Sequence, residues 1–449
     1  MSTKTSISGF LEWLPDQQLV EERFIDIART HFERAGFTPL RCRAIETMDT
    51  LLQKGETDKE IYAVRRRGGD DAADKNSWGL HFDLTVPFAR YISERLQTLV
   101  FPFRRYQIQP SWRGERPQEG RYREFIQADI DIVNRGTLPL TCDIEVIAVL
   151  LEVLRALPMP KVTLHLNNRK LMDGFFRGLD IADGADALRK IDKLAKIGEA
   201  SVGELLRENL SEAQTAALLR FCRISRPDVS FVDEVRQIGI RSPLLDEGLE
   251  ELVLLFEANA HAAQGRMLVD LRIARGFDYY TGTVAEGFME GFENLGAICS
   301  GGRYDNLVAE GGRLREAYPG VGMSIGISRI LGILMGRGHL AASRATPTCV
   351  LVALNNSGHT ATAIRIASTL RSRGIPAEVF GQPVAYGKQI QYAEKKGIPY
   401  VWFHDVKGDQ AHEVRDLGRA VQVEADLETW MPEAALLSPE IVYKGPENK

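Results

Sequence analysis

The sequence predicts an α+β protein with a large domain built on an antiparallel sheet and a smaller α/β domain towards the C-terminal end. Two runs of β-prone residues, 103–112 and 125–133, flank a polar loop and are typical of paired antiparallel strands. A helical pattern at 170–258 interrupts the large domain. In the last quarter of the chain, strand and helix patterns alternate, which is typical of a small α/β domain.

The elements can be placed in order from their spacing. Apolar residues recur at helical spacing over 16–35 and predict a helix there. Ser201 with Glu204 and Ser211 with Gln214 form capping-box patterns, which predict two helix starts. The later elements alternate as strand 349–354, helix 360–372, strand 377–380, helix 386–396 and strand 400–403. We expect one domain at 1–335, interrupted by the helical insertion at 170–258, then a linker at 336–347 and a second domain at 348–449.

Composition restricts the class of protein. Of 449 residues, 44% are hydrophobic and 26% are charged, which is ordinary for a soluble globular chain of two or three domains. Five widely spaced cysteines argue against a zinc site and a disulfide framework and fit a reducing cytoplasm. No stretch resembles a signal peptide or approaches the run of about 20 apolar residues that spans a bilayer. We therefore expect a cytoplasmic protein.

The stretch with the densest chemistry is Arg275-Gly276-Phe277-Asp278-Tyr279-Tyr280-Thr281-Gly282, which combines a cation, a carboxylate and two phenols. Aromatic and β-branched residues also favour strands, so composition alone favours packing slightly. Earlier in the chain, Asp83 and Thr85 would share one face of an extended strand and could accept hydrogen bonds from an ammonium group. An Asp followed by Thr and Pro is also common turn chemistry, so both interpretations stay open.

The polar loop between the two predicted strands is rich in arginine. From Arg104 to Arg123 inclusive there are six arginines, so a basic surface is possible here although the net charge is −5. The alternative is a charged surface hairpin, in which each exposed ion pair contributes at most about 1 kcal/mol. The choice of arginine over lysine suits bidentate phosphate recognition. Arg113 with Glu115, and Gln127 with Asp131, are spaced to share a strand face.

Together these motifs resemble those of the histidyl-tRNA synthetases. The octet at 275–282 resembles the family's histidine-binding signature, and the loop at 112–127 resembles class II motif 2. Further similar segments are Gly55-Glu56 with Glu60-Ile61-Tyr62, Ser300 to Leu307, motif 3 at 320–329 and the anticodon-binding pattern at 387–400. The resemblance implies a class II antiparallel-sheet catalytic domain with a helical insertion, followed by a class IIa anticodon-binding domain.

The resemblance also implies a role for each site residue. Catalysis at the α-phosphate of ATP is assigned to Arg275 and Arg113. The residues implied in histidine binding are Asp83, Thr85 and Gln127 at the amino group, Asp131 and Tyr280 at the imidazole, and Arg275 and Tyr279 beside them. Those implied in ATP binding are Arg113, Glu115, Arg123 and Arg329. Those implied in contacting the tRNA acceptor end are Arg116, Gln118 and Arg121.

The implied activity is ATP-dependent ligation of L-histidine to tRNA(His), with Mg²⁺ accompanying ATP and with a homodimer built partly by the first class II motif. Three positions depart from the family pattern: Arg43 replaces a proline, Ala285 an aromatic residue and Ser328 a glutamate. The alternative function is a catalytically inactive, histidine-sensing regulatory protein. Such relatives tend to lose the ATP-binding arginines or the C-terminal domain, which this chain keeps, so the enzyme is favoured.

Overall fold

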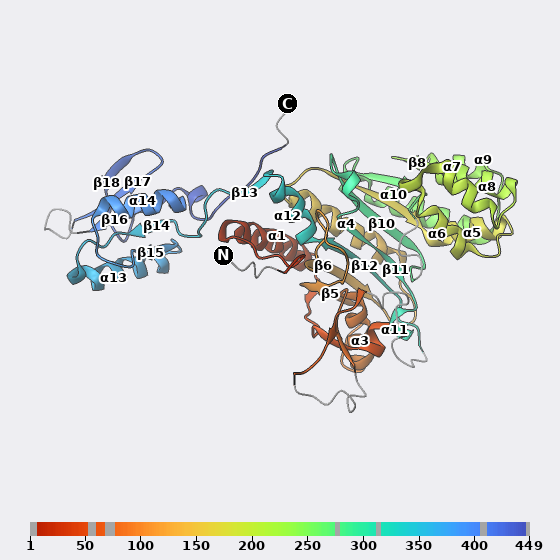
Figure 1. Cartoon of the computed structure of the whole chain (residues 1–449), viewed down its shortest axis with the longest axis horizontal. Coiled ribbons are helices and arrows are strands. Elements are labelled where there is room, and N and C mark those ends of the chain that lie inside the picture. Colours follow the sequence, from red (N-terminus) through yellow and green to blue (C-terminus); the bar gives the residue numbers. More distant parts are fainter. Residues whose placement is uncertain are drawn as a thin grey trace. The chain divides into compact units, whose positions relative to one another are not determined.

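The computed structural model describes residues 7–52, 60–67, 77–273, 279–310, 316–404 and 411–445. The chain divides into two compact units (Figure 1). The first unit comprises Met1–Leu11 with Phe24–Ile333, and the second comprises Glu12–Arg23 with Leu334–Lys449. The second unit resumes close to the expected linker at 336–347, which stays a prediction as a domain boundary.

The first unit is built on a nine-stranded sheet with the order β1-β5-β6-β12-β11-β10-β7-β9-β8. Its strands are β1 (Thr38–Pro39), β5 (Phe103–Trp112), β6 (Glu124–Val133), β7 (Val162–Asn168), β8 (Ser225–Arg226), β9 (Met267–Asp270), β10 (Thr283–Met289), β11 (Cys299–Tyr304) and β12 (Gly320–Gly326). Neighbours pair antiparallel except β1 with β5 and β7 with β9. The predicted antiparallel sheet and its central hairpin are therefore confirmed.

A helical segment follows β7 in the first unit (Figure 1). Its helices are α5 (Arg169–Gly178), α6 (Gly184–Ile191), α7 (Leu194–Arg207), α8 (Glu212–Cys222), α9 (Phe231–Gln237) and α10 (Pro243–Ala263). The capping box of Ser211 and Gln214 is confirmed at the start of α8. The helix start predicted at Ser201 is wrong, because Ser201 lies inside α7 and the helix is interrupted earlier, at Gly198 with φ 79°.

The remaining elements of the first unit are helices and a separate three-stranded sheet with the order β2-β4-β3. They are α1 (Pro15–Arg34), whose first residues belong to the second unit, β2 (Ile45–Thr47), α2 (Met48–Leu52), β3 (Ala63–Val64), β4 (Trp78–Leu80), α3 (Thr85–Arg95), α4 (Leu140–Ala156), η2 (Glu293–Leu295), α11 (Leu307–Glu310) and α12 (Ile327–Gly336), which ends in the second unit. Helix α4 packs against β12 and α10, and its apolar residues are buried. The helix predicted at 16–35 is confirmed by α1.

The second unit contains a five-stranded sheet with the order β15-β14-β16-β17-β18. Its elements are β13 (Leu340–Ala342), β14 (Val350–Val352), η3 (Ser357–His359), α13 (Thr360–Ser372), β15 (Ala377–Val379), α14 (Tyr386–Lys396), β16 (Tyr400–His404), β17 (His412–Asp416), β18 (Val421–Glu424), η4 (Ala434–Leu436) and β19 (Ile441–Tyr443). Strands β15, β14 and β16 are parallel, and β17 and β18 close the sheet antiparallel. The predicted strand and helix alternation is confirmed, with Trp402 fully buried in the core.

Two further findings concern the described residues. None of their helices is both long and apolar enough to cross a membrane. All five cysteines are free thiols, and burial raises the pKa of Cys222 and of Cys299 to about 12, so these two thiols stay protonated and unreactive at neutral pH.

Candidate active site

A cavity of about 310 Å³ lies in the first unit, beside the β5–β6 hairpin. Its lining combines arginines, carboxylates and an amide, among them Arg113, Glu115, Arg121, Gln127 and Arg329. These side chains come from the hairpin loop, from β6 and from the first turn of α12. The structure therefore brings together five of the residues singled out in the sequence, although they are spread over more than 200 positions.

Several contacts fix the side chain of Arg113, which directly follows the last residue of β5. Its Nε donates to the carbonyl of Phe82 at 3.0 Å, and its guanidinium lies 5.1 Å from the ring centre of Phe125. The Glu115 carboxylate lies 3.7 Å from Arg113 Nη1 and 3.7 Å from Arg121 Nη1. These long ion pairs leave both guanidinium groups able to engage a phosphate.

Arg329 enters the same cavity from α12. Its guanidinium donates to the carbonyl of Leu295. The neighbouring Ser328 is buried, and its hydroxyl accepts a hydrogen bond from the backbone N–H of Ile126 at 2.8 Å. Ser328, a departure from the family pattern, therefore ties the start of α12 to β6, and a glutamate side chain would have to leave this buried position.

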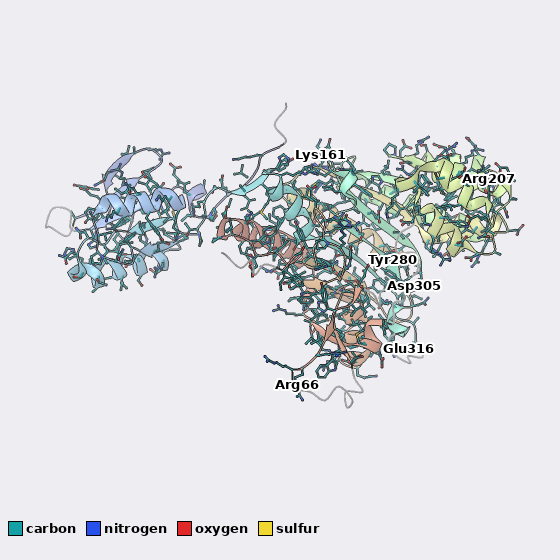
Figure 2. All side chains as sticks on the ribbon, in the orientation of Figure 1. Arg66, Lys161, Arg207, Tyr280, Asp305 and Glu316 are labelled. Carbon is teal, nitrogen blue, oxygen red and sulfur yellow. The ribbon has the colours of Figure 1, made fainter. Side chains whose placement is uncertain are left out.

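A second, smaller cavity of about 30 Å³ is lined by Asp131 and Tyr280, the two residues predicted to hold an imidazole. Thr85, predicted at the amino group, and Tyr279 line it as well. Tyr279 donates its hydroxyl hydrogen to the Tyr280 hydroxyl at 2.8 Å, and Thr281, next to Tyr280 (labelled in Figure 2), donates to Asp305 at 2.6 Å. Burial raises the pKa of Tyr280 well above its usual value of 10, so this phenol stays protonated at neutral pH.

Two residues that sequence analysis did not assign to the site contact the Asp131 carboxylate. Its Oδ2 lies 2.7 Å from Arg105 Nη2, and its Oδ1 accepts a hydrogen bond from the Tyr304 hydroxyl at 2.6 Å. Arg105 is fully buried, and its guanidinium also lies 4.3 Å from the ring centre of Phe88. A buried cation directly beside a carboxylate keeps that carboxylate ionised as an acceptor.

Asp131 also depends on a glycine across the sheet. Gly322 of β12 pairs with Asp131 in the register, and a Cβ atom built at Gly322 would lie 2.0 Å from Asp131 Oδ1. No side chain can occupy that space unless the carboxylate moves. Gly322 thus allows β6 and β12 to present a carboxylate at this point of the cavity.

The expectation for Asp83 and Thr85 needs a correction. They do not share one face of an extended strand, because Thr85 is the first residue of α3. Asp83 lies one residue before Leu84, the N-cap residue of α3, and its Oδ1 accepts a hydrogen bond from the backbone N–H of Val86 in the first turn at 3.0 Å. Thr85 lines the small cavity, whereas Asp83 is not among the lining residues of either cavity described above.

Arg123 is likewise not among the residues that line either of the two cavities. Its Nε donates to the backbone carbonyl of Glu115 at 3.1 Å, and its Nη1 donates to that of Ser8 at 3.4 Å. In these contacts Arg123 fastens the hairpin loop to the N-terminal segment. Its part in ATP binding stays a prediction.

The three residues predicted to meet the tRNA acceptor end lie on the hairpin loop. Gln118 and Arg121 exchange backbone hydrogen bonds of 3.1 and 2.9 Å, which close a tight turn around Gly120. Arg116, Gln118 and Arg121 are exposed. Arg275 lies within 274–278, and Gly55 and Glu56 within 53–59, so these residues fall outside the described part of the chain.

Comparison with known proteins decides the family. A family model described as Histidyl-tRNA synthetase matches residues 9–330, and one described as Anticodon binding domain matches residues 348–433. The chain belongs to the histidyl-tRNA synthetase family. Similar relatives are the histidine–tRNA ligases of Micrococcus luteus and Cutibacterium acnes, each 48% identical over 98% of this chain and 99% of the relative.

Solved structures agree with this result. The histidyl-tRNA synthetase from Nostoc sp. PCC 7120 superposes with a TM-score of 0.84 at 33% identity and covers 95% of this chain and 97% of its own. An ATP phosphoribosyltransferase regulatory subunit/histidyl-tRNA synthetase from Bacillus halodurans C, at 19% identity and a TM-score of 0.72 over 87% of this chain and 96% of its own, shares the fold. The predicted family, fold class and histidine–tRNA ligase activity are confirmed, and the regulatory alternative is not favoured.

Proposed function

We propose that this chain activates L-histidine with ATP and then transfers histidine to the 3′ end of tRNA(His). The observation that carries the proposal is the cavity of about 310 Å³ that collects Arg113 and Arg329 with Glu115 and Gln127. Two guanidinium groups suit the phosphates of ATP, and the carboxylate and amide suit groups that donate hydrogen bonds. The smaller cavity, with Asp131 and Tyr280, suits an imidazole.

The proposed chemistry has two displacements. A carboxylate oxygen of histidine forms a bond to the α-phosphorus, and the bond to the bridging oxygen of pyrophosphate breaks. The oxygen of a ribose hydroxyl of the tRNA then forms a bond to the acyl carbon, the bond from that carbon to the phosphate oxygen breaks, and AMP and the hydroxyl proton are released. The first nucleophile is already an anion, so the protein contributes mainly positioning and charge stabilisation by Arg113 and Arg275.

Magnesium belongs to the proposal as the companion of ATP. Mg²⁺ usually takes one or two protein carboxylates together with substrate phosphates. Glu286 of β10 is 8% exposed and lines the cavity with Arg113 and Arg329, so the residues present fit the ion. Glu286 would hold Mg²⁺, which neutralises phosphate charge when bound. Activity that is unchanged after Mg²⁺ is chelated would contradict this part.

The test of the proposed chemistry separates binding from reaction. Arg275→Ala should lower the rate of adenylate formation by about 100- to 1,000-fold, since removing one group that stabilises developing charge costs about 2.7 to 4 kcal/mol. Histidine affinity should change far less. Single-turnover adenylate formation and histidine titration measure the two quantities, and equal losses in both would refute the role of Arg275.

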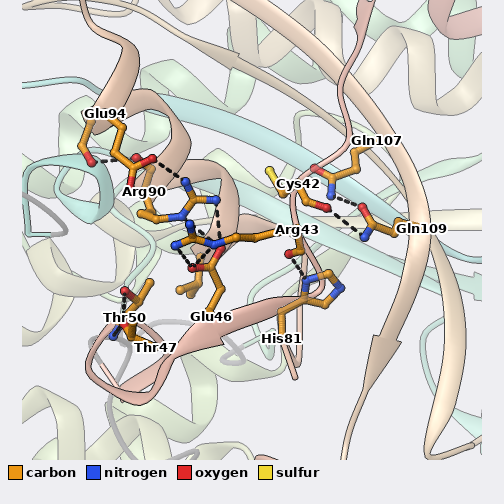
Figure 3. Close-up of polar contacts among 12 residues, drawn as sticks. Cys42, Arg43, Glu46, Thr47, Thr50, His81, Arg90, Glu94, Gln107 and Gln109 are labelled. Carbon is orange, nitrogen blue, oxygen red and sulfur yellow. Dashed lines mark hydrogen bonds and ion pairs between the residues drawn. The ribbon is translucent and has the colours of Figure 1, made fainter. Parts of the chain in front are cut away.

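We also propose a cytoplasmic homodimer. In the region of the first class II motif, the side chain of Arg43 bonds to Glu46, which Arg90 also contacts, and Arg90 in turn pairs with Glu94 (Figure 3). Glu46 is 1% exposed. The guanidinium of Arg43, which replaces the family proline, is therefore paired with a buried carboxylate. Sedimentation equilibrium should give twice the chain mass, and a monomer at micromolar concentration would refute the dimer.

A further inference from the structure

The hairpin loop, residues 113–123 between β5 and β6, packs against helix α12 through two glycines. A Cβ atom built at Gly332 of α12 would lie 2.0 Å from the Tyr122 hydroxyl oxygen and 2.6 Å from Tyr122 Cε2. A Cβ atom built at Gly120, where φ is 69°, would lie 2.9 Å from Ile333 Cγ1. Only glycine leaves room for contacts this close, so the phenol ring of Tyr122 lies directly on the backbone of α12.

This contact lies at the edge of the larger cavity. Gly120, Arg121 and Tyr122 line that cavity together with Arg329, which α12 carries about one turn before Gly332. The two glycines are buried and Tyr122 is half-buried. The contact between the ring and the helix therefore sets the spacing between Arg121 on the loop and Arg329 on α12.

A second support of the loop comes from the N-terminal segment. The backbone N–H of Arg123 donates to the carbonyl of Gly9 at 2.7 Å. Gly9 has φ 86°, and a Cβ atom built there would lie 2.8 Å from Pro117 Cγ. The loop is thus supported at Arg123 largely by backbone bonds and at Tyr122 by one side chain. Of these two supports, the one at Tyr122 can be removed by a single side-chain change.

The groups predicted to act on ATP have anchors of their own. Arg113 Nε donates to the carbonyl of Phe82, and the Arg329 guanidinium donates to the carbonyl of Leu295. Neither bond involves the contact between the loop and α12. The loop residues predicted to meet the tRNA acceptor end have exposed side chains, so their placement follows the loop backbone; they are Arg116, Gln118 and Arg121.

We propose that Tyr122 is a positioning residue for the transfer step: it sets the hairpin loop against α12 through Gly332, so that the loop delivers the tRNA 3′ end to the activated histidine. This inference rests on the proposed function. Adenylate formation should depend on the contact far less, because Arg113 and Arg329 are anchored independently. Tyr122 acts through the loop backbone rather than by contact with the reacting atoms.

The first test displaces the ring. Gly332→Ala places a methyl group where the outer atoms of Tyr122 lie, and because these atoms end a side chain, the ring should shift rather than the helix. Single-turnover transfer of histidine from preformed adenylate to tRNA(His) should slow by about 10- to 100-fold, the effect of a displacement of about 1 Å in a positioned group. Histidine-dependent exchange of pyrophosphate into ATP should stay close to the wild-type rate. Equal losses in both reactions, or an unchanged rate of transfer, would overturn the proposal.

Two changes at Tyr122 separate positioning from folding. Tyr122→Phe keeps the ring on Gly332 and should keep transfer. Tyr122→Leu removes the hydroxyl, Cε2 and Cζ atoms that approach Gly332 and should slow transfer selectively. Because Gly332→Ala and Tyr122→Leu break the same contact, the double variant should be no slower than the slower single variant. Losses that multiply in the double variant, or equal behaviour of the Phe and Leu variants, would overturn the role of Tyr122.

Gly336→Ala is the matched control, because it adds the same methyl group to α12 where no atom lies within 4 Å. Both reactions should keep their wild-type rates, and a loss equal to that of Gly332→Ala overturns the proposal. Urea denaturation shows whether each variant folds; if Gly332→Ala does not, the Tyr122→Phe and Tyr122→Leu pair decides alone. If the wild-type chain supports neither reaction, the proposed function itself fails, whereas a wild-type chain that performs both, with an unaffected Tyr122→Leu variant, overturns only the role of Tyr122.

Discussion

Replacing Asp129 with asparagine should stabilise the protein at pH 8. Burial raises the pKa of Asp129 from 3.8 to about 7, so between these values the folded protein holds a proton that the unfolded chain has released. The free energy of unfolding therefore falls as pH rises through this window, and the deficit is complete above pH 7. At about 1.4 kcal/mol per pKa unit, the deficit reaches at most about 4 kcal/mol. Asparagine does not titrate, so the variant avoids this loss in the free energy of unfolding.

Hydrogen–deuterium exchange of peptides from β6 and β12 measures the effect in the first unit itself. Wild type and variant are compared at the same pH, so the intrinsic exchange rate cancels. Asp129→Asn should protect these strands by about 1 to 4 kcal/mol at pH 8 and by little at about pH 3, where the wild-type carboxyl is largely protonated in both the folded and the unfolded state. A variant that is less protected than wild type at pH 8 would refute the reasoning.

Asp270 provides a control of opposite sign. Burial alone would raise its pKa, but hydrogen bonds from His165 and Arg272 outweigh it and lower the pKa of Asp270 from 3.8 to about 2. The stabilisation that results is present above pH 3.8 and is lost as pH falls through 2. Asp270→Asn should therefore destabilise the protein by about 2 kcal/mol, equally at pH 5 and pH 8.

Two further predictions concern the support beneath Asp131. Arg105→Met should lower the free energy of unfolding by about 3 to 5 kcal/mol, because it leaves the buried Asp131 carboxylate without its partner at 2.7 Å. Urea denaturation measures this loss. A loss below about 1 kcal/mol would contradict the prediction. Gly322→Ala should cost about 1 to 3 kcal/mol and weaken L-histidine binding, because the new Cβ would lie 2.0 Å from Asp131 Oδ1. Gly336→Ala, where no atom lies within 4 Å of a new Cβ, is the matched control; equal effects would contradict the argument.

Much of the fold could be predicted because local patterns and tertiary structure agree. The strands around the 103–133 hairpin and the helices α13 and α14 follow directly from residue periodicity. Ser211 begins α8 because its hydroxyl and the Gln214 side chain satisfy each other's backbone N–H groups. Ser201 has the same pattern, but the interruption of α7 at Gly198 comes three residues before it, so its local preference for a helix start is not used.

The candidate site was predictable where residues project directly into a cavity and unpredictable where they act through another residue. Arg113, Gln127 and Arg329 carry donors and acceptors at recognisable motif positions, and all three line the larger cavity. Arg105 gave no such sign, because its partner Asp131 lies 26 positions away and becomes a neighbour only through the β5–β6 register. Asp129 did offer a sign of this kind, because it lies two residues from each of two predicted site residues, Gln127 and Asp131, on the same strand.

At Asp83 the structure differs from what the sequence spacing predicted. The spacing of Asp83 and Thr85 suggested a strand, but the chain turns there and starts α3, which directs Asp83 towards a backbone N–H group. A two-residue spacing specifies a shared face only if the backbone is extended. Sequence alone could not decide between strand and helix start at this point.

The most direct test of the central claim is the exchange of labelled pyrophosphate into ATP. The account predicts exchange that requires L-histidine, that no other amino acid supports, and that falls by about 100-fold or more in Arg113→Ala, because Arg113 would contact the phosphorus centre where charge develops. Exchange that is independent of histidine, or an Arg113→Ala variant as active as wild type, would contradict the account.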